Sequence, residues 1–543
     1  MLKRNSILFT AMIALAAGCA VAGEEPSADK NLIKAHLSFL ADDLLEGRET
    51  GSRGFDIAAL YVVAQFTQYG VQPKGDRGGY LQTVPLKSSQ LVQESPSVAI
   101  LSNSRNEALA YLDDYAISGS LLEDRSQVSA PLIFVGYGID APRFNHRDYA
   151  DADVKGKIAV MLLGKPSSFP TEEGAHFGSA EHKRSAAAER GAVGIITLYT
   201  PVIEKIFPFA KNKDYRYIPN MTWIDHNGHA ANELAPVQNR ISLSLAAAQK
   251  LFTQVDVKLD DVYAAAAENK PLPHLDLKLS LSMAKRSIRS DIHSSNVIGL
   301  IEGSDPQLKH QYVVFSAHLD HLGIAKEKSG DNIYNGAMDN ASGVATLIET
   351  ARLFSLLQLK PKRSILFIAV TGEEKGLLGA DYFASNPTVP AASIVANVNL
   401  DMPMLTYDFS NVIAFGAEHS SLKQSVVKAM HKMKLELIAD PWPEQGLFTR
   451  ADHYMFVRQG IPSIFLVTGT GSFNKDENPA RIWEEHLAKH YHQTSDDLSL
   501  PFNFDAAARF AQVNFNIGLE IANDDKRPSW NKGDFFGDTF TKH

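Results

Sequence analysis

The strongest constraint on the fold lies in the second half of the chain, where short apolar runs follow one another. After about Asp291 these runs show no polar–apolar alternation, which is typical of strands buried on both faces of a sheet. Between two of them, Val344, Ile348 and Ala351 lie on one helical face. The pattern predicts an α/β sheet covered by helices. The predicted strands are 296–301, 312–317, 364–370, 393–400, 412–415 and 463–467.

The first half of the chain has a different rhythm. A helical pattern extends from about 31 to 82, whereas the segment from about 88 to 289 contains short apolar runs bounded by Gly, Pro and Asp. A chain of 543 residues is also too long for one hydrophobic core. We therefore expect an α+β domain inserted into the main domain. The predicted boundaries are 1–22 for a signal peptide, 23–88 and 290–525 for the main domain, 89–289 for the inserted domain and 526–543 for an irregular tail.

The N-terminus predicts export. Lys3 and Arg4 precede an apolar run over 7–17 that is too short to span a bilayer comfortably, and small residues follow. The Ala-Val-Ala sequence at 20–22 predicts cleavage and release into the periplasm or medium. A lipobox ending at Cys19 would instead anchor the protein, for example at an outer membrane. We favour release because Ala, rather than Leu, stands three positions before the cysteine. No transmembrane helix is expected in the mature chain.

Charge and cysteine content narrow the possible chemistry. The chain has 53 basic and 62 acidic residues, a net charge of −9, without a basic tract interleaved with aromatic residues. A nucleic-acid partner is therefore disfavoured. Cys19 is the only cysteine, so the globular part has no disulfide, catalytic thiol or thiolate metal site. Any metal must be held by histidines and carboxylates.

Histidine or acidic residues follow three of the predicted strands. His318 and Asp401 each come directly after a strand, and Glu373 and Glu374 follow another after two residues. Asp339 lies in the loop that opens the predicted helix. Ligands of open α/β sheets bind beyond the carboxyl ends of the strands, so these side chains are expected to meet. An isolated acid at such a position usually caps a helix or lies in a solvated turn. That explanation is poor for four connections, the three that follow strands and the loop of Asp339, which all carry a histidine or an acid.

These residue types fit a two-zinc site. Zinc accepts imidazole and carboxylate. Two zinc ions about 3.5–4 Å apart can share a carboxylate and a water, which becomes a hydroxide near neutral pH. A further free carboxylate must take the proton of the water. Adjacent Glu373 and Glu374 point in different directions, so one can ligate while the other acts as the base. No H-E-x-x-H, G-x-S-x-G or phosphate-binding loop supports another hydrolase chemistry.

Five motifs of the chain resemble those of the di-zinc exopeptidase family, which includes bacterial leucyl aminopeptidases and glutamate carboxypeptidase II. The resemblance implies a mixed, largely parallel sheet sandwiched by helices. The middle segment resembles the protease-associated domain that many members insert, with its markers at 153–160 and 186–194. The motifs are Ser316-Ala317-His318-Leu319-Asp320, Gly336-Ala337-Met338-Asp339-Asn340-Ala341-Ser342-Gly343, Thr371-Gly372-Glu373-Glu374, Asn399-Leu400-Asp401 and Tyr491-His492.

The resemblance implies five ligands around two Zn²⁺ ions. Asp339 would bridge the ions. His318 and Asp401 would complete one site, and Glu374 and His492 the other.

The resemblance also implies roles for residues beside the metals. Glu373 would be the general base and would hand its proton to the leaving amine. Tyr491 would steady the oxyanion. Asp320 would hydrogen-bond the far nitrogen of His318 and fix its tautomer. The peptide bond between Asp339 and the following residue would be cis.

Other candidates are weaker. His321 stands three residues after His318, but from a strand end it is expected to point elsewhere. His486 and His490 lie one turn apart on a predicted helix and are expected to face solvent. Asp452 matches an Asp-His pair of the family and is a candidate either for contact with the substrate or for supporting a metal ligand.

The leading hypothesis is a zinc-dependent aminopeptidase that removes N-terminal residues from peptides through a metal-bridging hydroxide. A carboxypeptidase or dipeptidase of the glutamate carboxypeptidase type is an alternative; it would need a basic pocket, for which Arg450 and Arg458 are candidates. A glutaminyl cyclase and a non-catalytic receptor-like relative are further alternatives. The complete ligand set and the base favour hydrolysis, whereas the N-terminal direction rests on the family resemblance.

Overall fold

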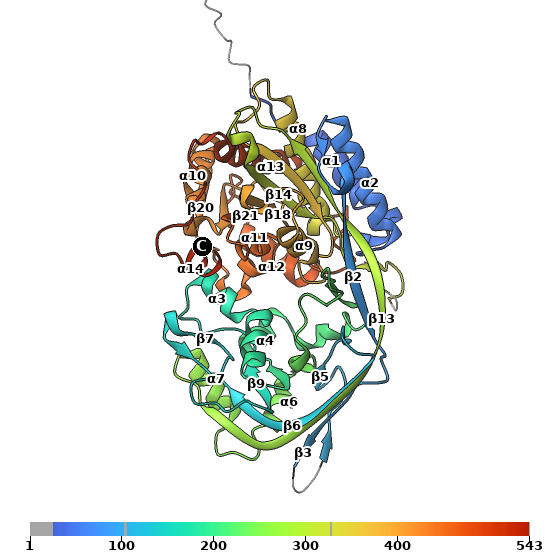
Figure 1. Cartoon of the computed structure of the whole chain (residues 1–543), viewed down its shortest axis with the longest axis vertical. Helices are drawn as coiled ribbons and strands as arrows, with labels where there is room; N and C mark the ends of the chain where they lie inside the picture. Colours follow the sequence, from blue (N-terminus) through green and yellow to red (C-terminus); the bar gives the residue numbers. More distant parts are fainter. Residues whose placement is uncertain (1–24, 103–105, 326–327, 542–543) are drawn as a thin grey trace, which may run out of the picture.

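One long strand joins the two parts of the molecule. The computed structural model describes residues 25–102, 106–325 and 328–541, so the predicted signal peptide and Cys19 lie outside the described residues, and export stays a prediction. Strand β13 (His274–Ile301) has 28 residues and curves along one side of the molecule beside β2 (Leu81–Leu91) (Figure 1). The predicted strand 296–301 is therefore only the end of a much longer one.

The main sheet contains the predicted buried strands. Its order is β20–β19–β21–β18–β14–β17–β13–β2–β11, and β21, β18, β14 and β17 are parallel. Every residue of β17, β18 and β21 is buried, which explains their continuous apolar runs. The strands are β11 (Asn220–Trp223), β14 (Tyr312–His318), β17 (Ser364–Val370), β18 (Ile394–Leu400), β19 (Asn411–Phe415), β20 (Glu436–Ile438) and β21 (Ser463–Thr468).

Helices pack against this sheet, as expected for a mixed α/β fold. Helices α8 and α13 contact β14 and β18, and α11 contacts β18 and β21. A Cβ at Gly518 of α13 would lie 2.3 Å from the ring of Phe315, so only glycine permits this close approach. Within the described ranges, no helix is long and apolar enough to cross a membrane. The helices are α1 (Lys30–Leu40), α2 (Arg53–Gln68), α8 (Ser342–Leu356), α9 (Leu378–Ser385), α10 (Leu422–Met433), α11 (His453–Val457), α12 (Pro479–Lys489) and α13 (Phe504–Asn523).

The segment between β2 and the second half of β13 builds a second sheet. Its order is β4–β3–β13–β6–β9–β10–β12–β5, with β6, β9, β10 and β12 parallel. Strands β2 and β13 pair across the predicted boundaries, for example Ser88 with Ser290. The exact domain limits stay predictions. The elements are β3 (Ser97–Leu101), β4 (Asn106–Ala108), β5 (Tyr115–Ala116), β6 (Arg125–Val135), β9 (Ile158–Leu162), β10 (Gly194–Leu198), β12 (Arg240–Leu243), α3 (Thr171–Gly178), α4 (Ala180–Glu189), α5 (Pro201–Ile206), α6 (Leu245–Lys250) and α7 (Leu259–Ala267).

The C-terminal tail is more ordered than the sequence suggests. It contains a short helix, α14 (Phe535–Phe540), whose N-cap Asp534 accepts a hydrogen bond of 3.0 Å from the backbone of Gly537. Phe535 and Phe536 are buried. The prediction of a wholly irregular tail was wrong because a six-residue helix is too short to show a periodic pattern.

Candidate metal centre

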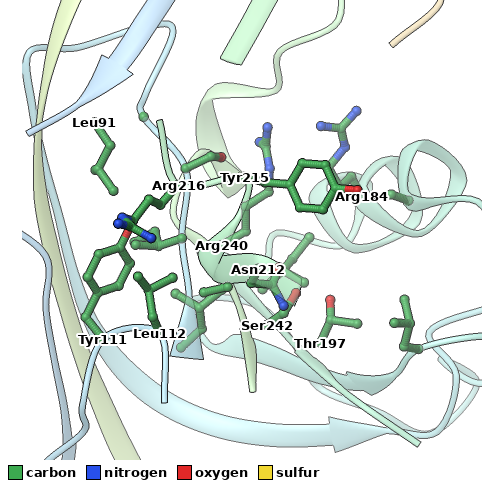
Figure 2. A pocket seen from close by; sticks show the side chains of 18 of the residues that line it. Leu91, Tyr111, Leu112, Arg184, Thr197, Asn212, Tyr215, Arg216, Arg240 and Ser242 are labelled. Carbon is green, nitrogen blue, oxygen red and sulfur yellow. The ribbon is translucent and has the colours of Figure 1, made fainter. Parts of the chain in front are cut away.

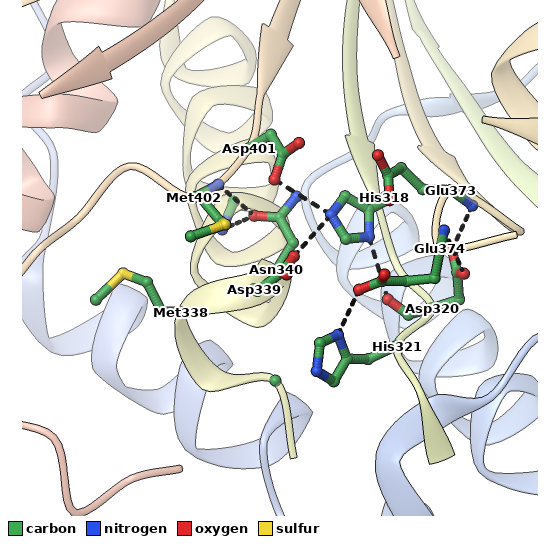
Figure 3. Close-up of polar contacts among 12 residues, drawn as sticks. His318, Asp320, His321, Met338, Asp339, Asn340, Glu373, Glu374, Asp401 and Met402 are labelled. Carbon is green, nitrogen blue, oxygen red and sulfur yellow. Dashed lines mark hydrogen bonds and ion pairs between the residues drawn. The ribbon is translucent and has the colours of Figure 1, made fainter. Parts of the chain in front are cut away.

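Three parallel strands and one helix bring four of the five predicted ligands, together with Glu373, to one edge of the main sheet. Strand β14 ends at His318, and Asp401 follows β18 directly. The turn after β17 carries Glu373 and Glu374, and Asp339 lies in the turn before α8. Because β14 pairs in parallel with β17 and β18, the carboxyl ends of all three strands meet here (Figure 3).

Asp339 lies between two histidines. Its Oδ1 is 3.2 Å from Nε2 of His318, and its Oδ2 is 3.2 Å from Nε2 of His492. Each histidine also faces a second acid. The same nitrogen of His318 is 3.2 Å from Asp401, and that of His492 is 3.1 Å from Glu374. The structure thus brings all five predicted ligands together, although their binding of metal stays a prediction.

The turn that carries His492 also holds the loop of Asp339. The carboxylate of Asp496 accepts hydrogen bonds from the backbone nitrogens of Met338 at 2.8 Å and of Asp339 at 3.0 Å. His492 itself has a φ of 57°, a conformation that non-glycine residues rarely adopt. The cis peptide bond between Asp339 and Asn340 that the resemblance implies is present.

The donor atoms are close enough together to hold metal ions. Those of His318, Asp339 and Asp401 lie within 4.8 Å of one another, as do those of His321, Asp339 and Glu374. Imidazole and carboxylate are donors that zinc accepts. Carboxylates outnumber histidines in this buried place, and a bound cation would neutralise the excess negative charge. The residues therefore fit a metal site of the predicted kind.

Glu373 lies beside the ligand set rather than between the two histidines. Its carboxylate is within 4.8 Å of the donor atoms of His318 and Glu374. Burial raises the pKa of Glu373 well above its usual value; His318 opposes this rise, and Glu374 and Asp401 add to it. The position is the one expected of a general base, while its role stays a prediction.

Asp320 contacts His318 in a different way from the one expected. The Nδ1 of His318 is 3.1 Å from the backbone carbonyl of Asp320, not from its carboxylate. A carbonyl only accepts, so this contact places the ring proton on Nδ1 and directs Nε2 to the site. The carboxylate instead accepts from the backbone nitrogens of Glu373 at 3.1 Å and Glu374 at 3.3 Å, and from Thr50. Asp320 therefore positions the turn of both glutamates.

His321 was expected to point away from the site, and this was wrong. It is fully buried, and its Nδ1 lies 2.7 Å from Oε1 of Glu374. Strand β14 ends at His318, so the alternation of strand faces no longer applies three residues later. His321 and His492 thus face the two oxygens of one carboxylate.

Arg48 is a buried residue of the site that the sequence did not reveal. Its guanidinium donates to the carbonyls of Leu319 at 2.9 Å, Asn335 at 2.6 Å and Gly336 at 3.1 Å. It therefore connects the segment after His318 with the loop before Asp339. A lone arginine in a turn carries no pattern that could have identified it.

The inserted segment also reaches the site. The hydroxyl of Tyr215 is 3.3 Å from Nδ1 of His492. This tyrosine lies in a segment without periodic pattern, so the contact depends wholly on how the two parts of the chain meet.

Tyr491 and Arg450 form a pair near the acids. Nη2 of Arg450 donates to the hydroxyl of Tyr491 at 3.0 Å, and both residues line a cavity with Asp339, Glu373 and Asp401. The cavity has a volume of about 80 Å³ and mostly apolar walls. These walls come from Ile206 and Phe207 of the inserted segment and from Trp442, Leu447, Phe465, Trp483 and Leu487 of the main domain.

The remaining candidates, Arg458, His486 and Asp452, differ in their positions. Arg458 lies away from this cavity and pairs with Glu181 at 2.6 Å. His486 is buried rather than solvent-facing, because it lies on the face of α12 that packs inward with Trp483. Asp452 is fully buried, and neither carboxylate oxygen has a hydrogen-bond partner among the described residues. Burial and the charge of Asp401 raise the pKa of Asp452 to about 8, although His318 opposes this rise.

Known proteins resemble parts of this chain. A "Probable zinc metalloprotease" of Pyrenophora teres f. teres is 37% identical over 113 residues, which are 20% of this chain and 23% of the relative. "Leucine aminopeptidase 1" of Trichophyton rubrum is 25% identical over 244 residues, which are 44% of this chain and 60% of the relative. The chain thus spans less than two thirds of the length of either relative.

A solved structure shares the fold. The aminopeptidase from Aneurinibacillus sp. strain AM-1 superposes with a TM-score of 0.54 at 18% identity, over 92% of this chain and 95% of that one. The sequence profile described as Peptidase family M28 matches residues 296–517, which include all the predicted metal ligands. Residues 296–517 of this chain therefore belong to peptidase family M28.

Proposed function

We propose that the chain is a zinc-dependent aminopeptidase that hydrolyses the first peptide bond of peptides. The observation that carries the proposal is the position of Asp339, whose two carboxylate oxygens each face a different histidine, His318 and His492, at 3.2 Å. A carboxylate so divided offers two adjacent metal positions with one shared ligand. Asp401 and Glu374 would complete the positions. The names of the aligned relatives, a zinc metalloprotease and a leucine aminopeptidase, support this activity.

Zinc at these positions would supply Lewis acidity and an activated water. Glu373 would take the proton of that water and pass it to the leaving amine. The hydroxyl of Tyr491, held by Arg450 at 3.0 Å, points to stabilisation of the negative charge that develops on the carbonyl oxygen. His318 keeps its Nε2 toward the site because Nδ1 donates to the carbonyl of Asp320.

The surroundings favour attack at the N-terminus over attack at the C-terminus. A carboxypeptidase needs a basic group for the substrate carboxylate, yet Arg458 pairs with Glu181 and Arg450 donates to Tyr491. Three acids, Asp339, Glu373 and Asp401, line the cavity against two cations, Lys211 and Arg450, and this acidic excess would attract a substrate ammonium group. The apolar walls favour an apolar first residue.

Three tripeptides distinguish the directions of attack. We expect the zinc-loaded protein to cleave Leu-Gly-Gly and its C-terminal amide, and to leave N-acetyl-Leu-Gly-Gly intact, because only a free ammonium group would be held by the acids. Amino-acid analysis of the products measures this. Cleavage of the acetylated peptide but not of the amide would establish a carboxypeptidase. Stability of all three peptides in the presence of zinc would contradict the proposed activity.

A further inference from the structure

A second cavity lies within the inserted segment. Its volume is about 370 Å³, and it shares no lining residue with the cavity beside the metal centre. Strands β9, β10 and β12 and helix α4 contribute to its lining, and so does the segment that carries Tyr215 (Figure 2). A volume of this size accommodates a small organic molecule.

Two arginines at this cavity share one acid. Arg240 donates to both carboxylate oxygens of Glu233, at 2.7 and 2.9 Å. Arg184 has a weaker share, with its Nη1 4.0 Å from the same carboxylate. The Nε of Arg184 is buried and has no hydrogen-bond partner within the part of the chain that the structure describes. A buried cation is costly unless it is well paired, and Arg184 is only weakly paired because Glu233 lies 4.0 Å away and is shared with Arg240.

Neighbouring groups add little to this pairing. Glu181, on the same helix as Arg184, pairs with Arg458 at 2.6 Å. Three further cations are present: Lys183 and Arg216 line the cavity, and Lys285 lies close by. Nζ of Lys285 donates to the carbonyl of Ser118 at 2.8 Å, and Nζ of Lys183 donates to the carbonyl of Leu162 at 2.9 Å. Burial, and then the charge of Arg240, lower the pKa of Arg184, whereas Glu233 and Glu181 oppose this. The cavity therefore has an excess of positive charge at one end.

Apart from its cations, Asn212 and two tyrosines, the cavity lining is largely apolar. Leucine, isoleucine and methionine side chains come from the strands and from the facing segments. Thr197 of β10 and Ser242 of β12 add hydroxyl groups. The apolar lining residues used in this argument are Leu91, Leu112, Ile117, Met161, Ile195 and Ile218.

We propose that this cavity binds a small monocarboxylate with an apolar body. The carboxylate would lie on the guanidinium of Arg184, whose planar donors match it, beside Arg240, whose Nη1 and Nη2 already hold Glu233. Four cations line the cavity, Lys183, Arg184, Arg216 and Arg240, and Glu233 offsets one of them, so a bound carboxylate would reduce the remaining positive charge. The apolar body would lie on the strands, where it displaces water from apolar surface. This proposal is independent of the peptidase activity.

The test uses N-acetyl-leucine, which has a carboxylate, an apolar side chain and no free amine. Isothermal titration calorimetry with the full-length, zinc-loaded protein measures its binding. We expect saturable binding to the wild type, and binding weaker by about tenfold or more to Arg184→Gln, since a charge-assisted hydrogen bond is lost. The matched control is Arg125→Gln, which removes the same charge from an exposed position of the same segment and should bind as the wild type does. N-acetyl-leucinamide, which lacks the carboxylate, should not bind.

A second variant tests the cavity without altering its charges. Ser242→Met places a larger side chain in the cavity and should also weaken binding, while its melting temperature shows that it is folded. The proposal is overturned if N-acetyl-leucine does not bind the wild type. It is equally overturned if folded Arg184→Gln or Ser242→Met binds as tightly as Arg125→Gln, which would place the ligand elsewhere, including the metal centre.

Discussion

At the scale of single residues, the metal centre separates groups that would bind metal from the one that would move protons. Glu373 and Glu374 are adjacent, yet only Glu374 contacts His321 and His492. Glutamine at position 373 keeps the shape of the side chain and removes its basicity. We expect Glu373→Gln to retain the zinc content of the wild type and to lose about 10²–10⁴-fold in kcat, the usual contribution of a general base.

Zinc analysis and steady-state kinetics on the same preparation measure both quantities. Glu374→Gln is the control for the neighbouring position and should lose zinc. Turnover near that of the wild type in Glu373→Gln would remove this residue from the mechanism, and loss of zinc would instead make it a ligand.

At the scale of elements, a largely buried histidine, His419, connects three parts of the fold. Nε2 of His419 is 2.7 Å from Glu172 of α3, and its Nδ1 is 2.5 Å from Asp534, the N-cap of α14. Burial alone would lower the pKa of His419, but the hydrogen bonds to Asp534 and Glu172 raise it from 6.5 to about 10. The folded protein therefore holds this proton more tightly than the unfolded chain does.

This linkage predicts a pH-dependent effect of His419→Gln on thermal stability. The contribution of His419 is complete below its unfolded pKa of 6.5 and is lost as the pH rises through about 10. The difference in Tm between wild type and variant should therefore be largest near pH 6.5 and should shrink toward pH 10. Arg143→Gln breaks an exposed ion pair between the inserted segment and α14, Arg143 with Asp538, and should shift Tm by a small, constant amount over this range. A constant difference for His419→Gln would contradict the linkage.

The elements themselves could largely be predicted, because their signals are local. The apolar runs of β14, β17, β18 and β21 are continuous in the sequence. Once such a run is recognised as a strand, the sequence also identifies the residue that follows its carboxyl end. Contacts made across the fold carried no such signal. Nothing in the sequence around Glu172 or Asp534 distinguishes them from solvent-exposed acids. They contact His419 only because α3 and the C-terminal tail pack beside it. For the same reason the carboxylate of Asp320 could be placed near His318 but not assigned its true partners.

At the scale of the whole molecule, the inserted segment is part of the metal site rather than an appendage. Tyr215 contacts His492, and Ile206 and Phe207 form walls of the cavity that contains Asp339 and Glu373. This arrangement depends on the curvature of β13, which runs along one side and around the lower end of the molecule and carries the second sheet below the main sheet (Figure 1). The sequence indicated that a domain is inserted. It could not predict the path of the 28-residue strand β13, because that path depends on pairing with β2 and with β6, which lie far from it in the sequence.

The contribution of the inserted segment to substrate binding can be measured at Phe207, which also lies 5.3 Å from the guanidinium of Arg450. Phe207→Ala removes apolar surface from the cavity and leaves the predicted metal ligands unchanged. A loss of about 1.4 kcal/mol, roughly half the value of a fully buried side chain, would raise KM for a leucyl peptide about tenfold. The value of kcat should change little, because this wall would hold the substrate and the transition state equally well. Val202→Ala, on the exposed side of the preceding helix, is the matched control and should leave both constants unchanged. An unchanged KM for Phe207→Ala would mean that Phe207 does not contact the substrate during turnover. The arrangement of the two parts in this structure would then not be the one that binds peptides.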